Sequence, residues 1–286
     1  MIALGAGVVL GTAVVVSRYA YDGGASGVVV AIGRSIIMTL AMLIGLKCAG
    51  ISLRLPPELF GMAALNGALM ALMTYGNIGA VEFISVGLAS LLFFTFPILI
   101  AVGVIVLGME RVRPSKLFLI IVAFFGLAIM LGASLGSVDI RGTVLSLMAA
   151  VATAINAILV MRFFRQTNVF VATLYFSAAA MAVLFVIAGV FADVRFPETA
   201  SGWAGVVGVG VLQTIGTPMY LYAIARIGAL KAGMATNIQP VVAIAQAWVL
   251  FGELLSPAQA AGGIVVLLAI ALMQYSDLRH QAAATP

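Results

Sequence analysis

Long apolar runs alternate with short segments that carry most of the charges along the whole chain. A helix needs roughly 20 apolar residues to cross the hydrocarbon core of a bilayer, and these runs have about that length. Membrane β-strands would instead show segments of about ten residues with alternating polarity, which the runs lack. The pattern predicts an all-α polytopic membrane protein with ten transmembrane helices, at 2–18, 26–46, 59–80, 85–107, 116–134, 141–161, 169–191, 202–224, 232–251 and 257–275.

The composition supports this prediction, because hydrophobic residues make up 64% of the chain and charged residues only 8%. A soluble domain carries about 25% charged residues, which cover its surface. We therefore expect a lipid bilayer around the protein, and the net charge of +5 does not indicate a nucleic acid partner. The single cysteine, Cys48, excludes an internal disulfide and a cysteine-based metal site. We expect neither a metal nor a cofactor.

Lysine and arginine gather in every second predicted loop, and the cytoplasmic loops of membrane proteins are rich in these residues. With the N-terminus inside, ten basic residues lie on the cytoplasmic side and three on the other side. The apolar N-terminus is predicted to be the first span rather than a removed signal peptide, since no basic segment precedes it. We expect a bacterial inner-membrane protein with both termini in the cytoplasm. The ten are Lys47, Arg54, Arg111, Arg113, Lys116, Arg162, Arg165, Arg226, Lys231 and Arg279, and the three are Arg18, Arg141 and Arg195.

Two stretches share a proline within an apolar run, a glutamate 13 residues later and a second proline four residues further on. The offset between them is 143 residues, half of the 286-residue chain, and further matches extend from 67 to 130. Each half holds five predicted spans, an odd number, so the second half enters the membrane from the opposite side, as in many secondary transporters. We predict two inverted five-helix repeats, 1–138 and 139–286, the second with a short cytoplasmic tail. The matched residues are Pro97, Glu110 and Pro114, and Pro240, Glu253 and Pro257.

The two prolines inside predicted spans, Pro97 and Pro240, cannot donate the backbone hydrogen bond that a continuous helix requires. Each is predicted to kink its helix or to leave a carbonyl without a partner. One interpretation is a tolerated kink, because proline is common in transmembrane helices. The interpretation we favour is a paired bend that shapes a cavity or a gate, because the repeat relates the two positions.

Polar side chains inside the spans are the candidate binding residues, because in lipid they must face protein or a water-filled cavity. Spans 59–80 and 202–224, related by the repeat, are unusually polar. Arg34 is either a structural arginine that snorkels or bonds to backbone carbonyls, or a contact for an anionic group. The other groups are neutral and would suit a zwitterion or an amphipathic metabolite. The candidate set is Arg34, Tyr75, Asn77, Thr95, Asn156, Gln213, Thr217, Tyr220, Asn237 and Gln239.

No aspartate or glutamate lies in the middle of a predicted span, so neither a buried proton carrier nor an aspartyl protease pair is visible. A phosphate-binding loop for ATP is also absent. Glu110 and Glu253 lie at helix ends and are interpreted as interfacial anchors, with proton coupling as the alternative. Gly7 and Gly11 have the spacing at which small residues let helices approach closely.

The repeated stretches VGLASLLFFTFPILIAVGVIVLGMERVRPS (86–115) and LKAGMATNIQPVVAIAQAWVLFGELLSPAQ (230–259) resemble the drug/metabolite transporter superfamily of the EamA type. The second copy keeps the family's Gly-Glu pair at Gly252 and Glu253, whereas Met109 separates the pair in the first copy. Arg34 resembles the arginine of the family's second helix, which supports a structural role. The resemblance implies ten helices and a central cavity that opens alternately to each side of the membrane.

The resemblance also implies a small-molecule substrate, since members of this family export amino acids, aromatic ones among them, and other metabolites. We expect a secondary transporter, not an enzyme, that exports amino acids or related metabolites by alternating access, as a monomer or a dimer. A sugar, nucleotide-type or drug transporter of the same family is the alternative, and a membrane-embedded enzyme is less favoured. The driving force stays open between proton exchange and facilitated efflux.

Overall fold

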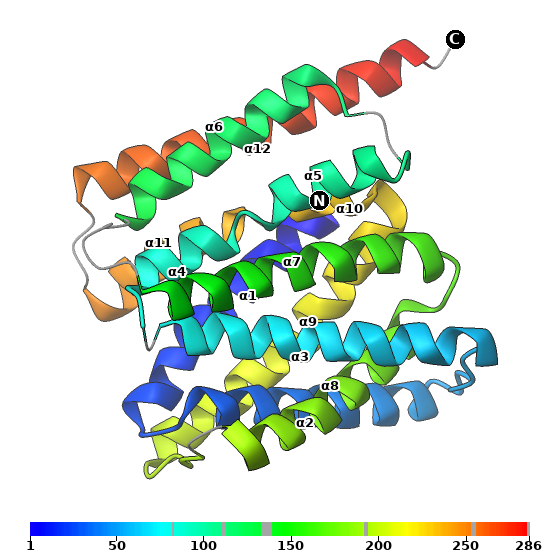
Figure 1. Cartoon of the computed structure of the whole chain (residues 1–286), viewed down its shortest axis with the longest axis vertical. Coiled ribbons are helices and arrows are strands. Elements are labelled where there is room, and N and C mark those ends of the chain that lie inside the picture. The colour runs from blue at the N-terminus through cyan, green and yellow to red at the C-terminus, as the bar shows by residue number, and fades with distance from the viewer. Residues whose placement is uncertain (82, 110–111, 133–138, 192–193, 253–255, 285–286) are drawn as a thin grey trace.

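The computed structural model describes residues 1–81, 83–109, 112–132, 139–191, 194–252 and 256–284, and this part of the chain is helical without strands (Figure 1). In lipid a backbone can satisfy its hydrogen bonds only within helices or closed barrels, so the apolar runs fold as helices. The elements are α1 (Ile2–Asp22), α2 (Gly27–Cys48), the 3-10 helix η1 (Pro57–Leu59), α3 (Phe60–Ala80), α4 (Val86–Phe93), α5 (Phe96–Val106), α6 (Pro114–Leu131), α7 (Ile140–Phe163), α8 (Val169–Phe191), α9 (Ala200–Ile227), α10 (Ala229–Ala235), α11 (Ile238–Phe251) and α12 (Pro257–Ala284).

These helices confirm the predicted class, an all-α multi-pass membrane protein, and the number of apolar helices is roughly consistent with the ten predicted spans. Within the described residues, nine helical stretches are long and apolar enough to cross a bilayer, and Pro257–Met273 of α12 forms a shorter apolar helix. Large apolar side chains cover the outside, such as Val106 and Val249, which are 77% and 72% exposed. A bilayer, rather than water, is the medium that suits this surface.

The fourth and ninth spans are each divided into two helices, whereas the pattern predicted single helices over 85–107 and 232–251. The first break, Phe94–Thr95, separates α4 from α5, and the second break, Thr236–Asn237, separates α10 from α11. Under the offset of 143 residues, the two breaks coincide to within one residue. The repeat as a whole stays a prediction.

The prolines explain why the helices are interrupted here. Pro97 and Pro240 both lie in the first turn of the segment that follows the break, where a missing N–H removes no hydrogen bond. The turn before each proline tightens: the N–H of Thr95 donates to the carbonyl of Leu92 at 3.2 Å, and the N–H of Asn237 donates to Met234 at 3.1 Å.

A glycine ends each of the two segments that follow a break. Gly108 comes after α5 with φ of 63°, and Gly252 comes after α11 with φ of 67°. An L side chain rarely adopts such a left-handed conformation, so glycine is the residue that suits this position. This conformation accounts for the glycine of the repeated motif, while Glu110 and Glu253 lie outside the described residues.

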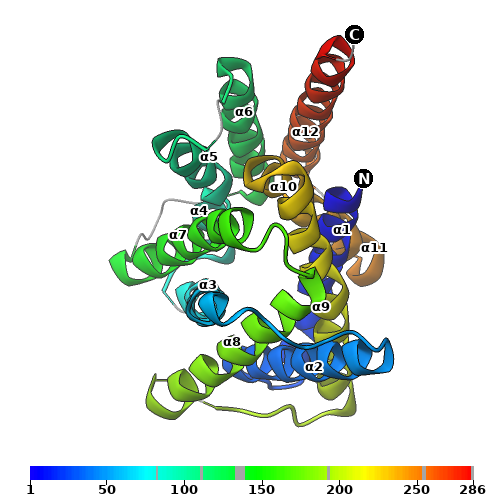
Figure 2. The same cartoon turned by 90° about the vertical axis from the view of Figure 1, so that its right-hand side faces the viewer.

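Small residues set the packing of the helices. α1 lies between α9 and α11, α3 lies between α7 and α8, and α2 contacts α8 and α9. α6 and α12 pair with each other along one edge of the molecule (Figure 2). Their closest approach is at Gly126 and Gly262, where a Cβ on Gly262 would lie 2.5 Å from the carbonyl oxygen of Gly126.

The glycines of α1 allow the same kind of close contact, as their spacing predicted. A Cβ on Gly7 would lie 2.4 Å from Cγ2 of Ile238, and one on Gly11 would lie 2.7 Å from the carbonyl oxygen of Gln239. No side chain could be added at either position without moving a helix. α1 is therefore seated directly against the second break.

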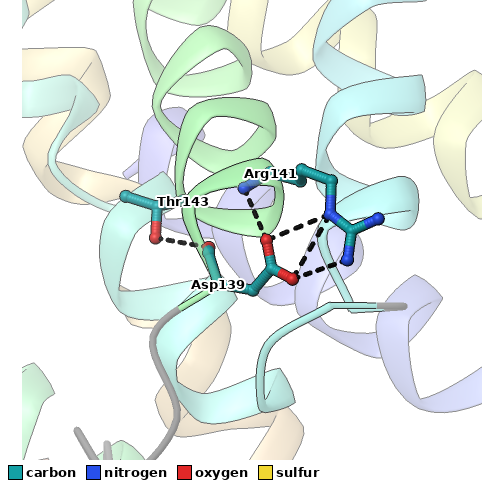
Figure 3. A network of polar contacts seen from close by, with 3 residues as sticks. All are labelled: Asp139, Arg141 and Thr143. Atoms are coloured by element: carbon teal, nitrogen blue, oxygen red, sulfur yellow. Dashed lines mark hydrogen bonds and ion pairs between the residues drawn. The ribbon is translucent and has the colours of Figure 1, made fainter.

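Asp139 caps the helix that follows the predicted boundary between the two repeats (Figure 3). Its carboxylate accepts hydrogen bonds from the backbone N–H and from Nη2 of Arg141, both at 2.8 Å. The guanidinium of Arg141 also lies 4.4 Å from the ring centroid of Phe83. The side-chain hydrogen bonds from Arg141, followed by its backbone N–H, hold the pKa of Asp139 below its usual range.

Two sides of the molecule are used below. The α5–α10 side is the one on which α5 ends and α10 begins, to the right in Figure 1. The α4–α11 side is the one on which α4 begins and α11 ends, to the left in the same view. By the count of basic residues, the α5–α10 side is predicted to be cytoplasmic.

Candidate functional site

The two broken spans meet in the interior, where α5 packs against α10. A Cβ on Gly233 would lie 3.0 Å from Cδ1 of Ile100 and 3.3 Å from Cε2 of Phe96, so α10 touches α5 beside the first break. Gly233 is also only one turn before the second break. The two interruptions of the backbone therefore lie near each other within the molecule.

Aromatic rings and an internal hydrogen bond close the first break. The rings of Phe93, Phe94 and Phe96 contact one another, with centroids 5.3 to 6.0 Å apart. The hydroxyl of Thr95, a predicted site residue, donates to the carbonyl of Leu92 at 2.7 Å. This break keeps its polar groups paired within the helix.

The second break leaves a polar group without a partner. Asn237 is only 4% exposed, and its Oδ1 has no hydrogen-bond partner among the residues that the structure describes. Its neighbour Thr236 is paired, since its hydroxyl donates to the carbonyl of Gly233 at 2.7 Å. A buried amide oxygen left unpaired costs roughly 1–3 kcal/mol, which a ligand with an N–H or O–H donor would recover.

A second unpaired group lies at a similar depth on the preceding helix. The hydroxyl of Tyr220 is buried, and no group in the described part of the chain pairs with it. α9 and α10 are in contact and are joined at Gly228. Tyr220 lies eight residues before Gly228, and Asn237 lies nine residues after it. At a rise of about 1.5 Å per residue, both groups lie about 12–14 Å from that connection.

α9 continues this polar surface along one face. Thr217 donates from its hydroxyl to Oε1 of Gln213 at 3.1 Å, as their spacing of four predicted, and both side chains are half-buried. Tyr220 is three residues beyond Thr217 and shares that face. Gln239, beside the second break, is half-buried as well.

Arg34 is held by a neighbouring helix. Its Nη2 donates to the hydroxyl of Thr74 and so links α2 to α3. The hydroxyl of Thr74 in turn donates to the carbonyl of Met70 at 2.8 Å. Tyr75 and Asn77 follow on α3 and are half-buried. The contact with Thr74 favours the structural interpretation of Arg34.

Asn156 is engaged in helix packing. Its Nδ2 donates to Oδ1 of Asn66 at 2.9 Å and to the carbonyl of Asn66 at 3.2 Å, which joins α7 to α3. Asn66 is fully buried and lies outside the predicted site set. Thr39 is another polar residue that the sequence did not single out, and its hydroxyl donates to Ser177 of α8 at 2.9 Å.

A groove of about 420 Å³ lies apart from these residues, between α1 and α11. Valines of both helices line it, and Gln246 donates from Nε2 to the hydroxyl of Thr12 at 2.9 Å within it. Val249, on its wall, is 72% exposed, so the groove faces the surrounding bilayer. In the described part of the chain, no three residues among His, Cys, Asp and Glu come together as metal ligands would.

Comparisons with known proteins agree with a membrane transporter. Residues 140–275 match the model of the EamA-like transporter family, so the second half of the chain is similar to such transporters. A solved crystal structure superimposes with a TM-score of 0.82 over 94% of this chain and 95% of that chain. The two sequences are 18% identical, so this similarity shows the fold alone. No curated protein sequence matches the chain.

Proposed function

We propose that the protein is a secondary transporter that exports neutral amino acids, aromatic ones among them, or related small metabolites by alternating access. The match of residues 140–275 to EamA-like transporters supports the transporter class. Four buried side-chain groups have no partner among the described residues: Oγ of Ser146, the hydroxyl of Tyr220, Oδ1 of Asn237 and Oε1 of Gln246. The observation that carries the substrate proposal is that two of them, the hydroxyl of Tyr220 and Oδ1 of Asn237, lie at a similar depth beside the second break. A buried site that leaves both groups unpaired favours a ligand that brings its own donors and acceptors.

The proposed substrate is small and uncharged overall, because the candidate residues beside the second break are neutral. Oδ1 of Asn237 accepts from the ammonium group, and the hydroxyl of Tyr220 donates to the carboxylate. No aspartate or glutamate lies in the middle of a predicted span to attract a cationic drug. The proposed location is the bacterial inner membrane. The distribution of Lys and Arg favours an orientation with both termini in the cytoplasm.

Counterflow in proteoliposomes tests this proposal. Vesicles loaded with unlabelled metabolites are offered labelled neutral amino acids, a sugar or a lipophilic cation, one at a time, with and without a pH gradient. We expect uptake of a neutral amino acid. Uptake of the sugar or cation alone would retain the transporter and overturn the substrate class. No uptake of any compound by folded protein would overturn both.

Two hydroxyl deletions on the same helix locate the site. Tyr220→Phe removes the unpaired hydroxyl. Tyr222→Phe, two residues further along α9, is the control, because it removes the hydroxyl of a different ring, which lies 5.1 Å from the guanidinium of Arg226. Loss of one ligand hydrogen bond raises the half-saturating substrate concentration by about tenfold. We expect this change for Tyr220→Phe and for Gln239→Ala, and wild-type flux for Tyr222→Phe. Wild-type flux in both Tyr220→Phe and Gln239→Ala would remove these residues from the site.

A further inference from the structure

Equivalent segments of the two broken spans are buried to different degrees, although the repeat predicts α4 to match α10 and α5 to match α11. In α10 six of seven residues are buried, whereas in α4 two of eight are buried, Leu88 and Ala89. In α5 five of 11 residues are buried, whereas in α11 only Pro240 of 14 is buried. All four segments lie within the described residues. The buried pair is α5 and α10, and the exposed pair is α4 and α11.

The contacts between helices show the same asymmetry. α5 packs against α10, and α7 packs against both α9 and α10. Under the repeat, the pair α5 and α10 corresponds to α11 and α4. The pair α7 and α9 corresponds to α1 and α3, and the pair α7 and α10 corresponds to α1 and α4. Among the described residues, none of these three related pairs packs to a comparable extent. The contact between α5 and α10 therefore has no counterpart of similar extent between α4 and α11, although α4 packs against α7.

Specific atoms close the α5–α10 side. Phe96 and Ile100 of α5 are 3% and 0% exposed and lie against Gly233 of α10. At the start of α10, the backbone N–H of Ala229 donates to Sδ of Met161 on α7 at 3.3 Å. This layer lies between the breaks and the predicted cytoplasm, so it separates the candidate site from that side.

The offset of 143 residues gives the matching layer on the other side. Gly233 corresponds to Ser90 of α4, while Phe96 and Ile100 correspond to Gln239 and Ala243 of α11. Ser90, Gln239 and Ala243 are all half-buried, whereas their three counterparts are buried. This matching layer is therefore less covered than the layer on the α5–α10 side, and its largest side chain is the polar Gln239.

We propose that Phe96, Ile100 and Gly233 form a closed cytoplasmic gate, and that Ser90, Gln239 and Ala243 form the opposite gate when the protein changes state. This inference rests on the proposed function and adds the residues of each gate. When α4 and α11 close together, Gln239 meets Ser90 and the contact between α5 and α10 opens. Because the repeat relates the two sets of contacts, one rocking motion exchanges them.

Cysteine labelling tests which gate is closed. In a Cys48→Ser background, Ile100→Cys and Ala243→Cys are exposed to a membrane-impermeant maleimide from each side of sealed vesicles. Glu198→Cys, in the exposed loop before α9, and the native exposed Cys48 are the freely accessible references for the two sides. With the second state populated at about 0.1–10%, Ile100→Cys is expected to react 10- to 1,000-fold more slowly than Cys48. Ala243→Cys is expected to react at a rate near that of Glu198→Cys, and equal rates at both gates would overturn the assignment.

A cross-link tests the opposite gate. The triple variant carries Ser90→Cys, Ala243→Cys and Ile100→Cys. A short bifunctional thiol reagent is expected to join positions 90 and 243 and so hold the opposite gate closed. Position 100 should then react with maleimide from the α5–α10 side. A cross-linked protein in which position 100 stays protected would contradict the exchange of gates, as would failure of the pair to cross-link. Labelling needs no substrate, so the two proposals can fail separately. If the two gates label unequally but no counterflow is detected, the proposed function alone is overturned. Counterflow with equal labelling overturns the gates alone.

Discussion

The two breaks have the same backbone design and different chemistry. Each break interrupts a span just before a proline, and the two breaks lie near each other where α5 meets α10. The first break is covered by three phenylalanine rings, and Thr95 bonds within its own helix. The second break is seated on the glycines of α1 and buries an amide oxygen of Asn237 without a partner.

This difference separates a packing role from a binding role. A break whose polar groups are paired and covered by rings contributes shape and can close a path. A break that leaves a buried polar atom unpaired loses stability at that point unless a ligand supplies the missing hydrogen bond. The comparison teaches that a repeated backbone feature need not repeat its chemistry.

The contact of α1 with the second break should be the region where a mutation has the largest effect. Gly11→Val would place a carbon 2.7 Å from the carbonyl oxygen of Gln239, so α1 and α11 would have to separate. Overpacking of this kind costs about 1–3 kcal/mol, and we expect a lower unfolding midpoint and less monodisperse protein in detergent. Gly45→Val on α2 is the matched control, because no atom of the described residues lies within 4 Å of a Cβ added there. Equal stability of Gly11→Val and wild type would contradict the close seating.

The prolines should have unequal effects on transport. Pro240→Ala restores an N–H that can donate to the carbonyl of Thr236 and continue the helix across the second break, displacing Asn237. We expect about a tenfold loss of counterflow for Pro240→Ala, about the loss of one ligand hydrogen bond. Pro97→Ala acts where no unpaired group lies, so a smaller loss is expected. Equal losses at matched protein incorporation would remove the distinction between the breaks.

A change far from both breaks should have little effect on transport and a pH-dependent effect on stability. Asp139 has a lowered pKa in the folded protein, so its contribution is present above the unfolded pKa of about 3.9 and is lost as pH falls through the folded value. Asp139→Asn should therefore lower the unfolding midpoint slightly at pH 7 and have no effect at the acid end of the titration. The exposed position keeps the effect small. A difference that persists at the lowest pH would place its cause elsewhere.

The membrane fold could be read from the sequence because it depends on long apolar runs, and lipid allows such runs one regular structure, the helix. The ten spans were predicted from this rule, and nine stretches of the described chain are long and apolar enough to cross, with a shorter tenth. The close approach at Gly7 and Gly11 was predicted instead from the spacing of small residues. The division of spans four and nine was predicted only as a kink. A proline sets where the N–H is missing, but the neighbouring turn decides whether the helix bends or stops.

The site was less predictable, because a list of polar residues does not say which of them already have partners. Asn156 and Asn237 have the same side chain and similar apolar surroundings in the sequence. In the structure Asn156 is paired with Asn66, which lies 90 residues away, whereas Oδ1 of Asn237 has no partner within the described ranges. The asymmetry between the gates was not predictable either, since it belongs to a conformation rather than to the repeat.

Counterflow by two matched variants would test the assignment of binding to the second break most directly. Asn237→Leu removes the unpaired amide, and Thr95→Val removes the paired hydroxyl at the first break. With equal amounts of folded protein in the vesicles, we predict that Asn237→Leu raises the half-saturating concentration of a neutral amino acid at least about tenfold. Thr95→Val should leave that concentration within about twofold of wild type, because its hydroxyl bonds to Leu92 rather than to a ligand. Unchanged apparent affinity in Asn237→Leu, or an equal shift in both variants, would contradict the account.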